Sequence, residues 1–232
     1  MQSDLVPPSA DFMIRNNVQR YAALWADAGD DCLKYPAEML VRFHDMYLRR
    51  QTPNGRVLDY GCGSGNNMRL FIDRGYETHG VEVTDAVLPL VERVTGSTER
   101  VRIISPDGSA LPYPDGYFDV IVANGVLCYL ASESRLRAVC DELHRCLRPG
   151  GAVYITMMGP RCYYVARLGR MIEPDTYEVS VHDGREYIYI IRDEQHLKEV
   201  FSSFETVTTG FFEQSLFGGE SNFHWIFAGR KA

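Results

Sequence analysis

The sequence predicts an α/β fold: a doubly wound, mostly parallel seven-stranded sheet in a three-layer α/β/α arrangement, ending in an antiparallel C-terminal hairpin. Three observations predict it. Short apolar runs typical of buried strands alternate with helix-length segments over residues 56–157. The first of these runs ends in three glycines spaced two residues apart. The last two strand-like segments, 206–212 and 223–228, are joined by a loop alone, which favours antiparallel pairing.

The N-terminal region predicts two helices. Residues 12–28 carry apolar side chains at helical spacing, namely Phe12, Val18, Tyr21, Leu24 and Trp25. A second helix is expected to begin near Pro36, because proline suits a first helical turn. We expect residues 1–50 to form a helical cap and residues 51–232 to form the main domain.

The elements of the main domain follow in alternation. Strands are expected at 56–60, 78–83, 101–105, 118–123 and 152–157. Helices are expected at 64–74, 85–94, 132–147 and 194–201.

Residues 159–192 interrupt this alternation as an insertion. Within it, the runs 177–181 and 186–191 flank His182-Asp183-Gly184, and Asp-Gly between alternating runs is a strong hairpin signal. Ligands of doubly wound sheets bind at the carboxyl ends of the strands, where this insertion begins. We therefore expect the insertion to be a substrate cover or a dimer element.

Composition and charge limit the kinds of partner, compartment and metal site that we expect for this protein. The formal charge of −7 disfavours a nucleic-acid partner, because an acidic surface repels phosphates. The uncharged stretch 120–132 is too short to span a bilayer, and the first residues lack the pattern of a secretory signal. Six cysteines without a C-x-x-C pair suggest free thiols in a reducing cytoplasm. The six histidines lack metal-ligand spacing, so no metal site is expected.

The glycine-rich segment 57–65, VLDYGCGSG, carries the strongest chemical signal. It resembles the first motif of the class I S-adenosylmethionine (SAM)-dependent methyltransferases, a strand followed by D-x-G-x-G-x-G. The matching positions are Asp59, Gly61, Gly63 and Gly65. The resemblance implies SAM as cofactor, with its methionine part over this loop. The dinucleotide pattern G-x-G-x-x-G fails in both registers, which argues against NAD.

Two further segments match the same family in order. Glu82 ends the second strand, where SAM and dinucleotide folds place an acid that accepts hydrogen bonds from ribose hydroxyls. Val83 is expected to pack against the adenine. The segment 107–112, DGSALP, resembles the family's D-A-x-x-L-P, which implies that Asp107 and the Gly108 N–H bind the adenine. Gly108 stands where the family usually has alanine.

The loop after the fourth strand begins at Asn124, which the resemblance places at a backbone or cofactor contact. It lacks the N/D-P-P-Y sequence of the family's base-modifying members, which disfavours DNA or RNA acceptors. Leu147-Arg148-Pro149-Gly150-Gly151 matches the family's L-x-P-G-G turn. The resemblance covers residues 55–158.

These features predict methyl transfer from SAM to a small-molecule acceptor through oxygen or nitrogen, with S-adenosylhomocysteine (SAH) as product. Candidate catalytic residues are His182 and His224, as bases, and Tyr129, in the loop facing the methyl donor. Tyr21, Trp25, Tyr163 and Tyr164 are candidate pocket walls. A protein or nucleic-acid methyltransferase and a non-catalytic SAM-binding partner subunit stay open as alternatives, and the oligomeric state, monomer or homodimer, is also open.

Overall fold

The computed structural model describes residues 7–29, 32–182, 184–216 and 220–232. In this part of the chain a seven-stranded sheet has the order β3-β2-β1-β4-β5-β10-β9. Its strands are β1 (Arg56–Tyr60), β2 (Glu77–Glu82), β3 (Val101–Ile103), β4 (Phe118–Asn124), β5 (Leu147–Met158), β9 (Glu205–Leu216) and β10 (Glu220–Arg230). Neighbours among β1 to β5 are parallel, whereas β10 runs antiparallel to both β5 and β9. The predicted fold class is confirmed.

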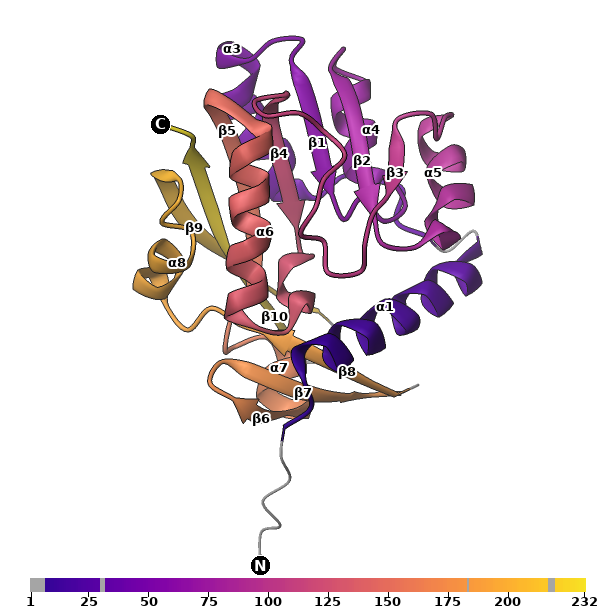
Figure 1. The fold of residues 1–232 in the computed structure, drawn as a ribbon, viewed down its shortest axis with the longest axis vertical. Helices are drawn as coiled ribbons and strands as arrows, with labels where there is room; N and C mark the ends of the chain where they lie inside the picture. The colour runs from indigo at the N-terminus through magenta and orange to yellow at the C-terminus, as the bar shows by residue number, and fades with distance from the viewer. Residues whose placement is uncertain (1–6, 30–31, 183, 217–219) are drawn as a thin grey trace, which may run out of the picture.

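Helices cover both faces of this sheet (Figure 1). One face carries α2 (Glu38–Phe43), the π-helical turn η2 (His44–Leu48), α3 (Arg49–Gln51) and α4 (Asn66–Ile72). Helix α4 also shares an apolar cluster with η3 (Asp85–Val87) and α5 (Leu88–Thr95). The other face carries α6 (Glu133–Cys146) and α8 (Glu194–Val200). The second helix begins two residues after Pro36 and changes to π-helical turns at His44.

The strands are buried on both faces, as expected for a sheet between two helical layers. Val57 and Val120 pack with the helices α2 and α4, and their neighbours Leu58 and Ile121 pack with α6. All four side chains are fully buried. This double burial fixes the register of β1 against β4, and so fixes where the loops at their carboxyl ends lie.

A second sheet lies beyond those carboxyl ends. It consists of β6 (Gly169–Glu173), β7 (Thr176–Val181) and β8 (Gly184–Tyr189), all antiparallel, and follows α7 (Tyr163–Leu168). The β7–β8 hairpin is the one that the sequence predicts, although Asp183 at its turn lies outside the described residues. Helix α1 (Ala10–Asp27) lies between the carboxyl ends of the large sheet and this small sheet (Figure 1). Residues 1–6 and 30–31 of the expected cap also lie outside the described part.

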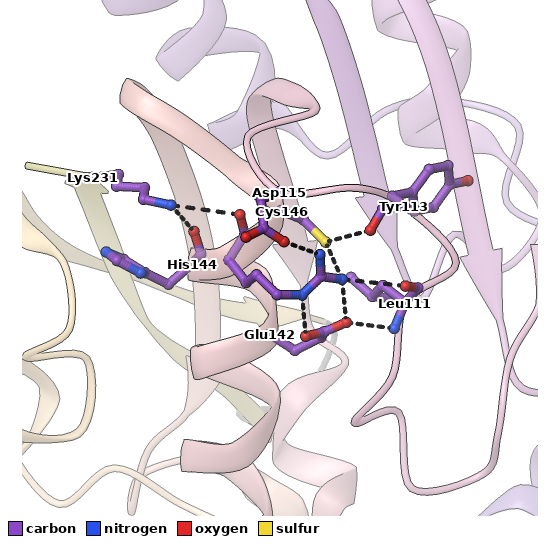
Figure 2. A network of polar contacts seen from close by, with 8 residues as sticks. Leu111, Tyr113, Asp115, Glu142, His144, Cys146 and Lys231 are labelled. Atoms are coloured by element: carbon purple, nitrogen blue, oxygen red, sulfur yellow. Dashed lines mark hydrogen bonds and ion pairs between the residues drawn. The ribbon is translucent and has the colours of Figure 1, made fainter.

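The segment after β3 is held to the last turn of α6 by a polar network (Figure 2). Arg145 Nε donates to Glu142 Oε2 at 2.8 Å, and its Nη1 lies 2.7 Å from Asp115 Oδ1. Glu142 Oε1 accepts a hydrogen bond from the Leu111 N–H at 2.7 Å. Lys231 Nζ donates to the His144 carbonyl at 2.8 Å, where cations suit the helix C-terminus. The network anchors the loop that forms one side of the site described next.

Among the described helices, none combines the length and apolar character needed to cross a membrane.

Candidate cofactor and acceptor site

A cavity of about 270 Å³ opens at the carboxyl ends of β1, β2 and β4, and α1 forms part of its wall. The large sheet and its loops contribute most of its wall, and α1 with η4 (Leu127–Leu130) contributes the rest. The sheet side is lined by Tyr60, Gly61, Cys62, Gly63, Asn66, Asn67, Val81, Glu82, Val83, Ile104, Pro106, Asn124, Gly125 and Val126. The helical side is lined by Ile14, Asn17, Val18, Tyr21, Trp25, Leu33, Tyr129 and Leu130.

The glycine loop presents bare backbone to this cavity. Gly61 has a φ of +71°, and a Cβ there would lie 2.3 Å from Val126 Cγ2. Gly63 has a φ of +50°, and a Cβ there would lie 3.1 Å from Trp25 Cζ2. Only glycine combines this left-handed conformation with such close neighbours. Gly65 begins α4 with a φ of +80° and does not line the cavity.

Two buried carboxyl groups stand beside the loop. Glu82 is 9% exposed and lines the cavity, and Asp59 is 1% exposed behind it. Burial raises the pKa of Glu82 to about 7. Burial, reinforced by the charge of Glu82, also raises the pKa of Asp59 to about 7. Within the described residues Asp59 Oδ2 has no hydrogen-bond partner, and Glu82 Oε2 accepts only a long bond, 3.4 Å, from the Val83 N–H. Unsatisfied buried carboxylates favour a ligand that brings donors or positive charge.

The segment at Asp107 contributes less to the cavity wall than the sequence predicts. Pro106 lines the cavity, whereas Asp107 and Gly108 are not among its lining residues. The Asp107 carboxylate accepts from the Ser109 N–H at 3.3 Å and lies 3.8 Å from Arg135 Nη1. The contacts of Asp107 and Gly108 with an adenine ring therefore stay predictions.

The glycine at position 108 has a local structural reason. The Tyr60 hydroxyl donates to the Gly108 carbonyl at 3.1 Å. A Cβ on Gly108 would lie only 1.9 Å from Tyr60 Oη, and its φ is +66°. The usual alanine would collide with this hydroxyl, so the departure from the family pattern follows from the neighbouring tyrosine.

The three catalytic candidates do not come together. Tyr129 lines the cavity. His224 lies on β10, stacked on Phe212 with ring centroids 5.0 Å apart, and burial lowers its pKa to about 4. His182 is exposed directly after β7. Neither histidine lines the cavity, so their catalytic roles stay predictions without support from this geometry.

The cover of the cavity is α1, and the described residues of the insertion 159–192 do not line it. Tyr21 and Trp25 stand at the wall as predicted candidates, whereas Tyr163 and Tyr164 do not. Sequence reasoning missed Asn17, which lines the cavity and is 2% exposed. The feature that could have identified Asn17 is a polar residue on the apolar face of α1, one turn before Tyr21.

Comparison with known proteins agrees with this arrangement. Residues 58–155 match a family model described as a methyltransferase domain. The chain is 29% identical over 163 residues to the malonyl-[acyl-carrier protein] O-methyltransferase of Halorhodospira halophila, an alignment that covers 69% of this chain and 54% of that protein. The chain thus spans about half the length of the curated relatives it matches.

Solved structures show the same fold. A SAM-dependent methyltransferase of Methanosarcina mazei superposes with a TM-score of 0.66 at 18% identity, covering 85% of this chain and 98% of that one. The 1,6-didemethyltoxoflavin-N1-methyltransferase of Burkholderia thailandensis, with SAH bound, superposes with a TM-score of 0.63 at 18% identity, covering 100% and 93%. Residues 58–155 thus match a methyltransferase-domain family, and the chain as a whole has the fold of the SAM-dependent methyltransferases.

The residues of this methyltransferase domain fit SAM, the cofactor of the family. The exposed backbone of Gly61 and Gly63 leaves room for a ligand to approach closely. Glu82 offers a carboxylate that can accept two hydroxyl donors. A bound SAM would bring the positive charges of its sulfonium and ammonium groups to a cavity beside two acids whose ionisation burial opposes.

Proposed function

We propose that the protein transfers a methyl group from SAM to an oxygen atom of a small-molecule acceptor. One juxtaposition carries the proposal. The glycine loop and Glu82 line the same cavity as Tyr21 and Tyr129. A bound cofactor would therefore have a second, separately walled half of the cavity beside it. The printed function of the Halorhodospira halophila relative, an O-methyltransferase, supports oxygen as the acceptor atom.

The chemistry divides between cofactor and protein. SAM supplies an activated methyl group. The chain's own residues bind, orient and exclude water, and such alignment provides much of the rate in a displacement at carbon. In this proposal Glu82 holds the ribose, Val83 packs on the adenine, and Asn124 lies close to the transferred group.

The remaining parts of the proposal concern the partner class, the cellular compartment and the domain organisation. The charge of −7 supports a partner that is not a nucleic acid. All six cysteines are buried thiols, which supports a reducing compartment, the cytoplasm. We further propose that residues 1–50 act as a cap on the domain 51–232, supported by the position of α1 over the cavity.

Two measurements test the proposal. Calorimetry with SAM and with SAH tests cofactor binding, and SAH release with a panel of hydroxyl and carboxyl metabolites tests transfer. We expect both cofactor forms to bind and a methylated product to form, and at limiting SAM Glu82→Ala should slow product formation by about ten- to a hundredfold. Binding without any product would favour a non-catalytic partner subunit, and product on tRNA or protein alone would favour the macromolecular alternative.

A further inference from the structure

The cavity wall formed by α1 and η4 differs from the cofactor wall. Ile14 and Val18 of α1 and Leu130 of η4 make it largely apolar, and Tyr21 and Tyr129 are its two tyrosines. Because α1 lies across the carboxyl ends of the strands (Figure 1), a molecule beside the cofactor must contact this wall.

Tyr21 and Tyr129 form one polar unit on that wall. Their ring centroids are 4.8 Å apart with an interplanar angle of 60°, and their hydroxyl groups are hydrogen-bonded to each other. Either hydroxyl can be the donor in this bond, because a phenol group both donates and accepts. Two hydroxyls that share one bond retain one further proton, which the pair can donate to a ligand.

Both hydroxyls keep their protons at neutral pH. Burial raises the pKa of Tyr21 and of Tyr129 well above the ordinary tyrosine value, and the nearby Glu186 adds to the effect. Glu186 is 5% exposed and ion-paired with Arg20, the residue before Tyr21. The tyrosine pair therefore acts as a hydrogen-bond donor and not as a base.

Hydrogen bonds from Asn17, one helical turn before Tyr21, fix the position of the tyrosine pair. Asn17 Nδ2 donates to the Tyr129 carbonyl at 2.9 Å and to the Tyr187 carbonyl at 2.7 Å. Asn17 precedes Tyr21 by four residues on α1, so it holds the helix bearing Tyr21 against the turn bearing Tyr129. The donor is thus held in place before any ligand enters, which lowers the entropy cost of binding.

We propose that Tyr21 donates a hydrogen bond to an oxygen of the methyl acceptor, that Tyr129 orients this donor, and that the acceptor is a small, largely apolar carbonyl, carboxyl or hydroxyl compound. The inference rests on the proposed function, because it assigns the second half of the same cavity. Ile14, Val18 and Leu130 contact the apolar body of the acceptor.

The test uses SAH-loaded protein and two probes, acetophenone and α-methylstyrene, which differ by an oxygen in place of a methylene group. Calorimetry at millimolar probe should show about five- to tenfold tighter binding of acetophenone, the effect of one neutral hydrogen bond. Tyr21→Phe should abolish this preference, whereas Tyr129→Phe should keep part of it. Tyr47→Phe is the matched control, because Tyr47 stacks on Phe43 in the apolar cluster on the α2 face of the sheet and should leave the preference intact.

Three results would overturn the inference: equal affinity for both probes in the wild type, an unchanged preference in Tyr21→Phe, or no binding of either probe. SAH binding accompanied by any of these would overturn this inference alone. Failure of SAH to bind would overturn the proposed function and this inference with it.

Discussion

Asn17 pairs with the backbone of Tyr187 as a neighbouring strand would. Its Nδ2 donates to the Tyr187 carbonyl at 2.7 Å, and its Oδ1 accepts from the Tyr187 N–H at 2.9 Å. The same Nδ2 also donates to the Tyr129 carbonyl. One buried amide therefore joins α1, β8 and η4, so the small sheet supports the helix that covers the cavity without lining the cavity itself.

Replacing Asn17 should loosen this support. Asn17→Ala leaves the buried backbone groups of Tyr187 and Tyr129 unpaired, which should lower the free energy of unfolding by about 1–3 kcal/mol. Thermal denaturation should show a melting temperature lower by about 2–4 °C per kcal/mol. Asn16→Ala is the control, because Asn16 makes one exposed bond to the Arg185 carbonyl and should cost less than half as much. Equal losses would show that Asn17 is not a special support.

Glu82 should determine cofactor affinity. Glu82→Ala removes a carboxylate that accepts ribose hydroxyls, so the Kd for SAM should rise by about ten- to a hundredfold. The melting temperature of the ligand-free protein should change little or rise, because burial opposes the charge of Glu82. The exposed Glu92→Ala on α5 controls for loss of net charge. Calorimetry that finds the same Kd in Glu82→Ala and the wild type would contradict this role.

The Asp59 and Glu82 pair should make stability and affinity depend on pH in opposite directions. Both pKa values are raised to about 7 from the ordinary values of 3.8 and 4.5. Between pH 4 and 7 the folded protein therefore binds more protons than the unfolded chain. The contribution of these two carboxyl groups to stability is complete below their pKa values in the unfolded chain. It is lost as the pH rises through about 7, their pKa in the folded protein.

SAM affinity should instead increase from pH 6 to pH 8, because Glu82, which lines the cavity, is expected to bind SAM in its ionised form. Binding near pH 7 should therefore release protons. Melting curves of the ligand-free protein and calorimetry in buffers of different ionisation enthalpy measure the two effects. The variant Asp59→Asn with Glu82→Gln should flatten the stability profile. An unchanged profile in that variant would assign the pH dependence to other groups.

Close packing around Gly61 should make its substitution by alanine more destabilising than the same substitution at another glycine with a left-handed backbone. Gly61→Ala and Gly96→Ala both place a side chain at positive φ, which costs about 1–2 kcal/mol. Only at Gly61 would the new Cβ meet another side chain, 2.3 Å from Val126 Cγ2, whereas nothing lies within 4 Å at Gly96. Urea unfolding should show a further loss of about 1–3 kcal/mol for Gly61→Ala, partly restored by Val126→Ala. Equal losses at the two glycines would mean that backbone strain alone matters there.

The sequence by itself determined the fold class and the cofactor side of the cavity. Both depend on signals within short stretches: the alternation of strands and helices, and a strand that runs directly into Gly61 and Gly63. The alternating runs around Asp183-Gly184 likewise predicted the β7–β8 hairpin, because hairpin register is a local property.

Only the tertiary structure decided what covers the cavity. Helical spacing shows that α1 has an apolar face, but not which surface that face meets. Asn17 reaches Tyr129 and Tyr187 across 112 and 170 residues of sequence, and such contacts leave no local pattern. The insertion was expected to be a substrate cover or a dimer element; its strand β8 packs against α1, and its described residues do not line the cavity. The chain thus specifies its glycine loop locally, whereas the proposed acceptor wall exists only once three distant segments pack together.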